Sequence, residues 1–175
     1  MLGEEERSEE EGSFSMARIP KKIAIVAAGG LVNILFAILL YIVLATIIIG
    51  NIGDAITSTG NFILAMWDSI KMIFTGNVTA DDLMGPIGIS EVVAQTSSII
   101  DFLYIMALVS MSLGVTNLLP FPPLDGGKIL IYIIEAIRKK PLKENFELEL
   151  QMIGFIALIT LSIYVAFNDV GRIIN

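Results

Sequence analysis

Apolar residues gather in three long blocks along this 175-residue chain, and almost no charge interrupts them. The blocks run from about Ile23 to Ile49, from Ile99 to Leu119 and from Leu150 to Phe167. Within them the only charged residue is Asp101, near the start of the second block. A helix of about 20 apolar residues crosses the hydrocarbon core of a bilayer. The pattern therefore predicts an all-α integral membrane protein, with three transmembrane helices in a membrane domain over residues 23–175.

Two shorter segments between the blocks mix apolar and polar residues. The stretch from Asn61 to Phe74 sets Trp67 among apolar neighbours, which predicts an amphipathic helix at the membrane interface. Packing on another domain is the alternative for this helix. A turn at Thr75–Asn77 and a second break at Gly85–Gly88 follow it. The stretch from Lys128 to Ile137 is too short to cross the membrane, so it predicts a short helix near the cytoplasmic surface.

The basic residues set the predicted orientation. They cluster before the first block and between the second and third, at Arg18, Lys21, Lys22, Arg138, Lys139, Lys140 and Lys143. The only basic residue of the segment 51–98 is Lys71, and the only basic residue of the tail after the third block is Arg172. Cytoplasmic loops carry the excess of lysine and arginine, so we expect the N-terminus and residues 128–149 in the cytoplasm and the C-terminus outside. This predicts a multi-pass protein of the inner (cytoplasmic) membrane of a cell.

Composition narrows the classes further. Hydrophobic residues make up 55% of the chain and its mean hydropathy is +0.80, as in a membrane protein. The absence of cysteine excludes disulfides, thiol nucleophiles and thiolate metal sites. The net charge of −7 comes largely from six glutamates within residues 1–22, a segment too polar to fold alone. It predicts an acidic, flexible cytoplasmic leader rather than an acidic binding arm, and no nucleic-acid partner is expected.

The stretch that carries chemistry is Asn117-Leu118-Leu119-Pro120-Phe121-Pro122-Pro123-Leu124-Asp125-Gly126-Gly127, at the end of the second block. It brings a carboxylate to membrane depth, where an ionisable residue is costly and marks a functional site by default. Proline and glycine break a helix there, so the freed backbone groups must face protein or a watery cavity. An ordinary Asp-Gly turn is the alternative interpretation.

This stretch resembles the Asn-x-x-Pro-x-Pro-x-Leu-Asp-Gly motif of the site-2 proteases, the intramembrane zinc metalloproteases. The positions that match are Asn117, Pro120, Pro122, Leu124, Asp125 and Gly126. The resemblance implies that Asp125 is a zinc ligand. It also implies that Asn117, Pro120 and Pro122 bind the substrate, a transmembrane protein in the lipid bilayer. Gly126 and Gly127 would have a structural role, since glycine lets the backbone turn sharply beside the metal.

Other parts of the chain are similar to the same family. They are Gly85-Pro86-Ile87-Gly88 with the amphipathic segment before it, Asn168-Asp169 after the third block, and Gly29-Gly30-Leu31-Val32-Asn33. The last resembles a Gly-Pro-x-x-Asn element, with Gly30 where proline is usual. We expect Asn33 to be a structural residue that forms hydrogen bonds between helices rather than a catalytic one.

Two parts of the family pattern are missing from this sequence. It has no histidine, so the His-Glu-x-x-His helix with its zinc ligands and general-base glutamate is absent, and no residue is a catalytic candidate. A PDZ domain, usual in the bacterial subgroup, does not fit in the roughly dozen residues between Ile49 and Asn61. Zinc on Asp125 alone should bind too weakly for catalysis. The opening Leu2–Glu6 resembles the family loop between the first and second spans, so the native chain is expected to begin earlier.

The sequence thus predicts a portion of an intramembrane zinc metalloprotease that cleaves transmembrane segments and is inactive without a segment bearing His-Glu-x-x-His. A non-catalytic scaffold that binds transmembrane helices is the alternative. A small transporter with a discontinuous helix is a third, but it predicts a matching broken helix in another span, which neither the first nor the third block has. Supply of the missing segment, in cis or in trans, separates the first hypothesis from the second.

Overall fold

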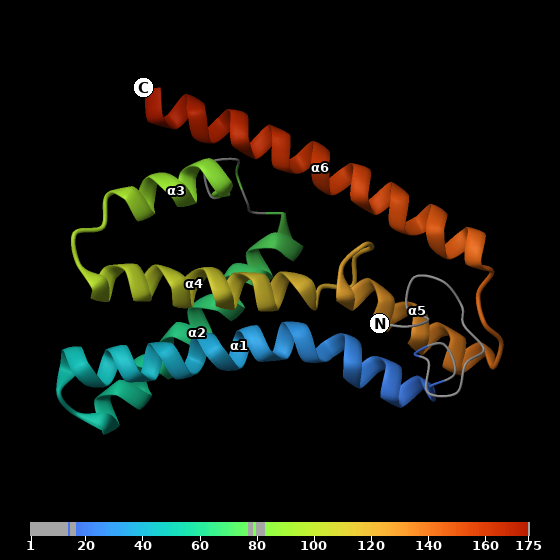
Figure 1. Cartoon of the computed structure of the whole chain (residues 1–175), viewed down its shortest axis with the longest axis horizontal. Helices are drawn as coiled ribbons and strands as arrows, with labels where there is room; N and C mark the ends of the chain where they lie inside the picture. Colours follow the sequence, from blue (N-terminus) through green and yellow to red (C-terminus); the bar gives the residue numbers. More distant parts are fainter. Residues whose placement is uncertain (1–13, 15–16, 77–78, 80–82, 175) are drawn as a thin grey trace. The chain divides into compact units, whose positions relative to one another are not determined.

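The computed structural model describes residues 14, 17–76, 79 and 83–174. These residues contain no strand and form six α-helices: α1 (Ile19–Ile49), α2 (Ile52–Thr75), α3 (Pro86–Ala94), α4 (Ile99–Asn117), α5 (Asp125–Arg138) and α6 (Glu144–Ile174) (Figure 1). Most of the predicted leader, residues 1–22, lies outside the described part of the chain.

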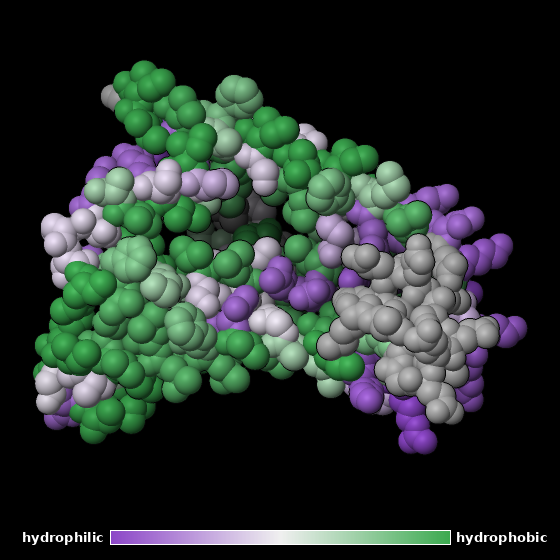
Figure 2. Space-filling model, viewed as in Figure 1, coloured by the Kyte–Doolittle hydropathy of each residue, from purple (hydrophilic) through white to green (hydrophobic). Residues whose placement is uncertain are grey.

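Three helices, α1, α4 and α6, are long and apolar enough to cross a membrane. They coincide with the three apolar blocks, which confirms the predicted all-α membrane fold with three spans. Large apolar side chains on them are exposed, as lipid contact requires; Leu39 is 63% and Ile153 67% exposed. Figure 2 shows hydrophobic residues over much of the visible surface. The last helix exceeds its block, because Glu144 starts it six residues before Leu150.

The helix α2 is longer than the predicted interfacial helix, because it begins at Ile52 rather than at Asn61. Its start is fixed by Asn51, whose side-chain oxygen accepts hydrogen bonds from the backbone N–H groups of Gly53 (2.8 Å) and Asp54 (3.3 Å). Asparagine is one of the preferred N-cap residues. The cap explains why the helix begins at Ile52, although the glycines and threonines of its first turns are weak helix formers and did not predict a helix there. Placement of α2 at a membrane interface stays a prediction.

Tight turns bound α2 at both ends. Gly76 ends the helix with a left-handed φ of 71°, at the predicted Thr75–Asn77 turn. At the other end, only Gly50 and Asn51 separate α1 from α2, and Gly50 also has a left-handed φ, of 74°. A linker of this length leaves no room for a further domain between the two helices.

The helix α3 begins where the sequence predicted only a break. Gly85 is its N-cap and Pro86 lies in the first turn. The missing N–H of proline costs no hydrogen bond there, because first-turn N–H groups have no partner within the helix. Asp169 of α6 completes the cap, since its Oδ2 accepts from the N–H groups of Gly85 (3.0 Å) and Gly88 (2.8 Å). Asp169 is 0% exposed, and its Oδ1 lies 3.2 Å from Arg172 Nη2. Three donors therefore satisfy this buried carboxylate.

The chain divides into two compact units, one of residues 1–32 with 114–155 and the other of 33–113 with 156–175. In the first unit, α1 and α5 share a small apolar cluster of Phe14, Val26 and Tyr132. Lys22 Nζ lies 5.7 Å from the ring centres of both Phe14 and Tyr132, a cation–π arrangement. The cluster holds the start of α1 against α5.

In the second unit, aromatic and small residues hold α1, α2 and α4 together. Tyr41 of α1 stacks on Phe62 of α2 with ring centres 4.3 Å apart, and its ring lies 5.9 Å from that of Tyr104 on α4. Ser110 Oγ of α4 donates to the main-chain oxygen of Asn33 on α1 at 3.0 Å. Alanines that are 0% exposed stand at the helix contacts, as close packing in membranes favours: Ala37, Ala55 and Ala107.

Two ion pairs of the same i,i+3 spacing should contribute very differently to stability. Asp169→Ala removes the acceptor of two buried N–H groups, so we expect the free energy of unfolding to fall by about 3 kcal/mol. Asp68 pairs with Lys71 at 2.8 Å on the exposed surface, so Asp68→Ala should change it by less than about 1 kcal/mol. Unfolding by SDS in mixed micelles, followed by far-UV circular dichroism, measures both. Equal losses in the two variants would contradict the capping role of Asp169.

Candidate functional site

The loop 118–124 links α4 to α5 and carries most of the motif. Its first two N–H groups donate back to carbonyls of α4, at 3.1 and 3.0 Å. Its second half is a turn in which the Leu124 N–H donates to the Phe121 carbonyl at 2.9 Å. Pro122 and Pro123 stand inside that turn and have no N–H to satisfy. The loop can therefore interrupt an apolar helix without leaving many donors unpaired.

Asp125 is the first residue of α5. The extended Leu124 is the N-cap, and its carbonyl accepts from the N–H groups of Gly127 (3.0 Å) and Lys128 (3.3 Å). A carboxylate in the first turn of a helix is stabilised by the positive end of the helix dipole. The Asp125 side chain is partly buried and forms no hydrogen bond or ion pair with another residue that the structure describes. Its oxygens are free to bind a cation or a donor.

Gly126 and Gly127 let the first turn of α5 lie directly on the loop backbone. A Cβ on Gly126 would overlap the carbonyl oxygen of Leu119, and one on Gly127 would lie 2.8 Å from the main-chain carbon of Phe121. Real Cβ atoms do not approach main-chain atoms this closely, so neither position has room for a side chain. Any larger residue would push the carboxylate-bearing turn away from the loop. This contact supports the structural role expected of the two glycines.

Two further glycines bring α6 and α1 onto the same loop. A Cβ on Gly154 of α6 would overlap the carbonyl oxygen of Pro122, which is main chain and cannot move aside alone. A Cβ on Gly30 of α1 would lie 2.9 Å from Leu118 Cγ. The loop thus lies against α5, α6 and α1 at these glycines. Sequence reasoning missed Gly154, whose only signal was a lone glycine within an apolar helix.

The other predicted site residues are divided between the two units: Asn117 and Pro120 belong to the first, with Asp125, and Asn33 belongs to the second. Asn117 is the half-buried last residue of α4, and Pro120 is exposed in the loop. A Cβ on Gly29 would stand 3.7 Å from Asp125 Oδ2, so α1 passes beside the carboxylate. Asn33 belongs to the second unit, where its main-chain oxygen, rather than an assigned side-chain bond, joins α1 to α4. Its structural role stays a prediction.

Asp125 is a single candidate metal ligand. Among the residues that the structure describes, no group of three histidine, cysteine, aspartate or glutamate side chains is placed to hold a metal ion. A catalytic zinc site commonly uses three protein ligands and a water. Asp125 alone therefore does not make such a site from the residues that the structure describes.

Comparison with known proteins identifies the family. The profile of peptidase family M50 matches residues 1–161. The chain therefore belongs to peptidase family M50, the site-2 proteases, as the motif around Asp125 predicted.

Its relatives carry protease names. It is 35% identical over 130 residues to the zinc metalloprotease RasP of Shouchella clausii, which covers 73% of this chain and 31% of that protein. It is 34% identical over 128 residues to the regulator of sigma-W protease RasP of Bacillus subtilis, covering 72% and 30%. The regulator of sigma E protease of Haemophilus influenzae is 33% identical over 128 residues, covering 72% and 29%. The matched segment thus spans less than a third of each relative.

Substitution of two glycines of α6 tests the contact between this helix and the loop 118–124. Gly154→Ala places a methyl group against the Pro122 carbonyl, so we expect the free energy of unfolding to fall by about 1–3 kcal/mol, as in other overpacked sites. Nothing lies within 4 Å of a Cβ on Gly171, so Gly171→Ala should be neutral or stabilising by up to about 1 kcal/mol. SDS titration of the two variants under one condition measures the difference. A neutral Gly154→Ala would show that α6 does not rest on the loop.

Proposed function

We propose that this chain provides the acidic zinc ligand and the substrate-binding loop of an intramembrane zinc metalloprotease. The observation that carries the proposal is the Asp125 carboxylate, which lies in the first turn of α5, just after an apolar helix, and has no partner among the residues that the structure describes. An ionisable side chain beside a membrane-spanning helix is energetically unfavourable, and such residues commonly mark a binding or catalytic site. Relatives of the chain are named zinc metalloproteases.

Each motif residue has a proposed task around this carboxylate. Asp125 would hold zinc together with two imidazoles of a His-Glu-x-x-His segment, which this sequence does not contain. Bound zinc would lower the pKa of its water and polarise the scissile carbonyl. Asn117 donates its amide to the unwound substrate backbone, and Pro120 and Pro122 keep the facing loop extended. Gly126 and Gly127 hold the ligand-bearing turn against that loop.

The substrate of the complete enzyme would be a transmembrane segment of another membrane protein. Peptide bonds in a helix are shielded, so a substrate segment would have to unwind before its scissile carbonyl became accessible. We infer that the chain alone is inactive, because one carboxylate does not make a catalytic zinc site. The protein would lie in the inner (cytoplasmic) membrane, with the 128–149 segment in the cytoplasm and the C-terminus outside.

A non-catalytic scaffold is the second candidate, favoured by the lack of other ligand groups among the described residues. In that function the same loop would bind transmembrane helices, and Asp125 would accept hydrogen bonds from them. The two candidates differ in whether Asp125 contacts zinc once a His-Glu-x-x-His segment is present.

Restoring the missing segment tests the enzyme function. When this chain is joined in cis to a family span bearing His-Glu-x-x-His, we expect bound zinc by metal analysis and cleavage of a transmembrane reporter. Asp125→Ala should lower zinc affinity and cleavage by more than about 100-fold, since even outer partners of zinc ligands contribute about 10–100-fold. Asp101→Ala is the matched control, because Asp101 is also a first-turn aspartate of a helix. Unchanged zinc content in Asp125→Ala would leave the scaffold as the better proposal.

Orientation can be tested because the chain contains no cysteine, so single-cysteine variants have no background. Ser97 and Asn145 are exposed and lie on segments predicted to face opposite sides of the membrane. In intact spheroplasts, Ser97→Cys should react with an impermeant maleimide, whereas Asn145→Cys should react only after lysis. The reverse labelling pattern would invert the topology derived from the basic residues.

A further inference from the structure

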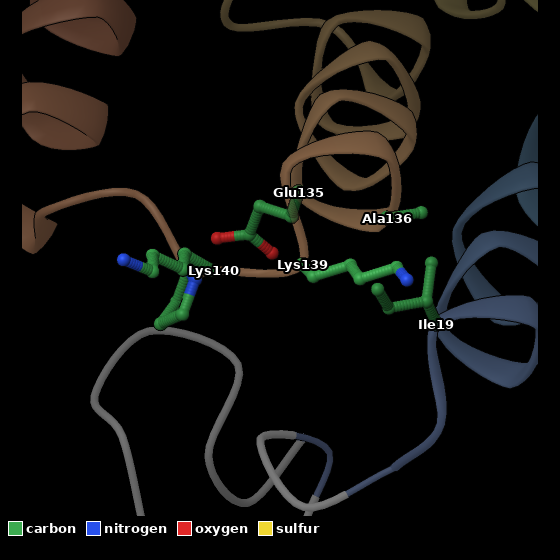
Figure 3. A pocket seen from close by; sticks show the side chains of 6 residues that line it. Ile19, Glu135, Ala136, Lys139 and Lys140 are labelled. Atoms are coloured by element: carbon green, nitrogen blue, oxygen red, sulfur yellow. The ribbon is translucent and has the colours of Figure 1, made fainter.

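The end of α5 and the start of α1 border an open hollow whose lining is partly apolar and partly charged. Its volume is about 390 Å³, and it is lined by Ile19, Glu135, Ala136, Lys139, Lys140 and Pro141. Isoleucine, alanine and proline supply an apolar wall, and the two lysines supply positive charge. Figure 3 shows Lys139 extending from below the last turn of α5 toward Ile19, with Glu135 beside it. All six residues belong to the first compact unit.

The charge of this hollow is not neutralised by its own residues. Segment 135–143 contains four cations and one carboxylate, Glu135. Glu135 Oε1 accepts the backbone N–H of Leu142 at 2.7 Å, so the glutamate serves to fold the chain back after α5. Neither Lys139 nor Lys140 forms an ion pair with another residue that the structure describes. Two ammonium groups therefore remain available to an anion.

The shape of the chain at Lys139 sets the two lysines on opposite sides of the hollow, with Lys139 directed toward Ile19 and Lys140 directed away from it (Figure 3). Lys139 adopts a left-handed φ of 53° and is the C-cap of α5. This reversal turns the backbone toward Pro141 instead of continuing the helix. A left-handed C-cap is normally glycine or asparagine, so a lysine here is unusual. The position presents a charge where a glycine would present none.

The hollow lies at an abrupt change from apolar to cationic surface. Exposed apolar residues on α5 recur at helical spacing up to its last turn, and they are Leu130, Ile133, Ile134 and Ile137. Ile137 is 77% exposed, and Arg138 follows it directly. On α1 the same change occurs between Lys22 and Ile23, and Lys22 contacts Tyr132 of α5. Both helices thus turn basic at one end, which is where a bilayer carries its phosphates.

From these observations we infer that the hollow binds the phosphate of an anionic phospholipid of the surrounding leaflet, with Lys139 facing the phosphate and Lys140 adding positive charge at the rim. The occupant is a lipid rather than free phosphate because half of the lining is apolar, and a bare phosphate gains nothing from Ile19, Ala136 and Pro141. A lipid brings the glycerol and the first methylenes of its chains together with its charge. This inference does not depend on the proposed protease function.

Lipid retention by the purified full chain tests the site. The chain is equilibrated in detergent with equal amounts of phosphatidylglycerol and phosphatidylcholine of identical acyl chains, and native mass spectrometry counts the lipids retained. We expect the wild type to prefer phosphatidylglycerol, with each lysine contributing about fivefold. Lys139→Gln/Lys140→Gln should bring the ratio of the two lipids close to one. Lys71→Gln, which removes an exposed lysine on α2 that pairs with Asp68, should leave this ratio unchanged.

Further arms separate the alternatives. Lys139→Arg/Lys140→Arg keeps the charge and should keep the preference, and a loss of the preference in this variant would contradict a site that depends on charge. An excess of inorganic phosphate should not displace the lipid; displacement would make the site one for free phosphate and overturn the inference. Neutralising the six leader glutamates should have no effect. A gain of lipid on that change would show that the leader occupies the hollow instead. An unaltered ratio in the glutamine double variant would also overturn the inference.

Discussion

The arrangement around Asp125 depends on contact between main chains at glycine. Gly126, Gly154 and Gly30 each lie where a Cβ would strike the loop 118–124 or its neighbours. A loop at membrane depth cannot hydrate its backbone, so protein has to surround it. Side chains between the helices would hold them apart and leave gaps that lipid cannot fill with hydrogen-bond partners. Small residues remove this obstacle, and the first turn of α5 can then carry a carboxylate at a fixed place.

Much of the fold could be predicted because the membrane makes the hydrophobic pattern nearly sufficient. The three spans follow from uninterrupted apolar blocks, and the short α5 follows from a glycine pair and a Lys-Lys-Pro end. The misses have local causes. The start of α2 depends on a single capping side chain, Asn51, and α3 depends on Asp169 reaching it from 81 residues away along the sequence. A long-range cap has no periodic signal, so Gly85–Gly88 could only be interpreted as a break.

The candidate site divides in the same way. Asp125 could be proposed as a site residue because a charge beside prolines is conspicuous within an apolar sequence, and its role as a ligand stays a prediction. The contribution of Gly154 was not identifiable, since it exists only when α6 and the loop are in contact. Asn33 shows the opposite limit. Its amide attracted attention in the sequence, yet the hydrogen bond that joins its helix to α4 uses the main-chain oxygen, which every residue has.

The Asp125 carboxylate also connects the stability of the folded chain to the binding of a cation or a further helix at this site. In the isolated chain this partly buried group has no partner among the residues that the structure describes. Any cation that the folded state binds and the unfolded state does not will raise the stability of the folded state by an amount that grows with the affinity and concentration of the cation. A complementary helix and a metal ion that meet at this oxygen would strengthen each other's binding by the same factor. The melting temperature of the chain is therefore a gauge of how completely the site has been assembled.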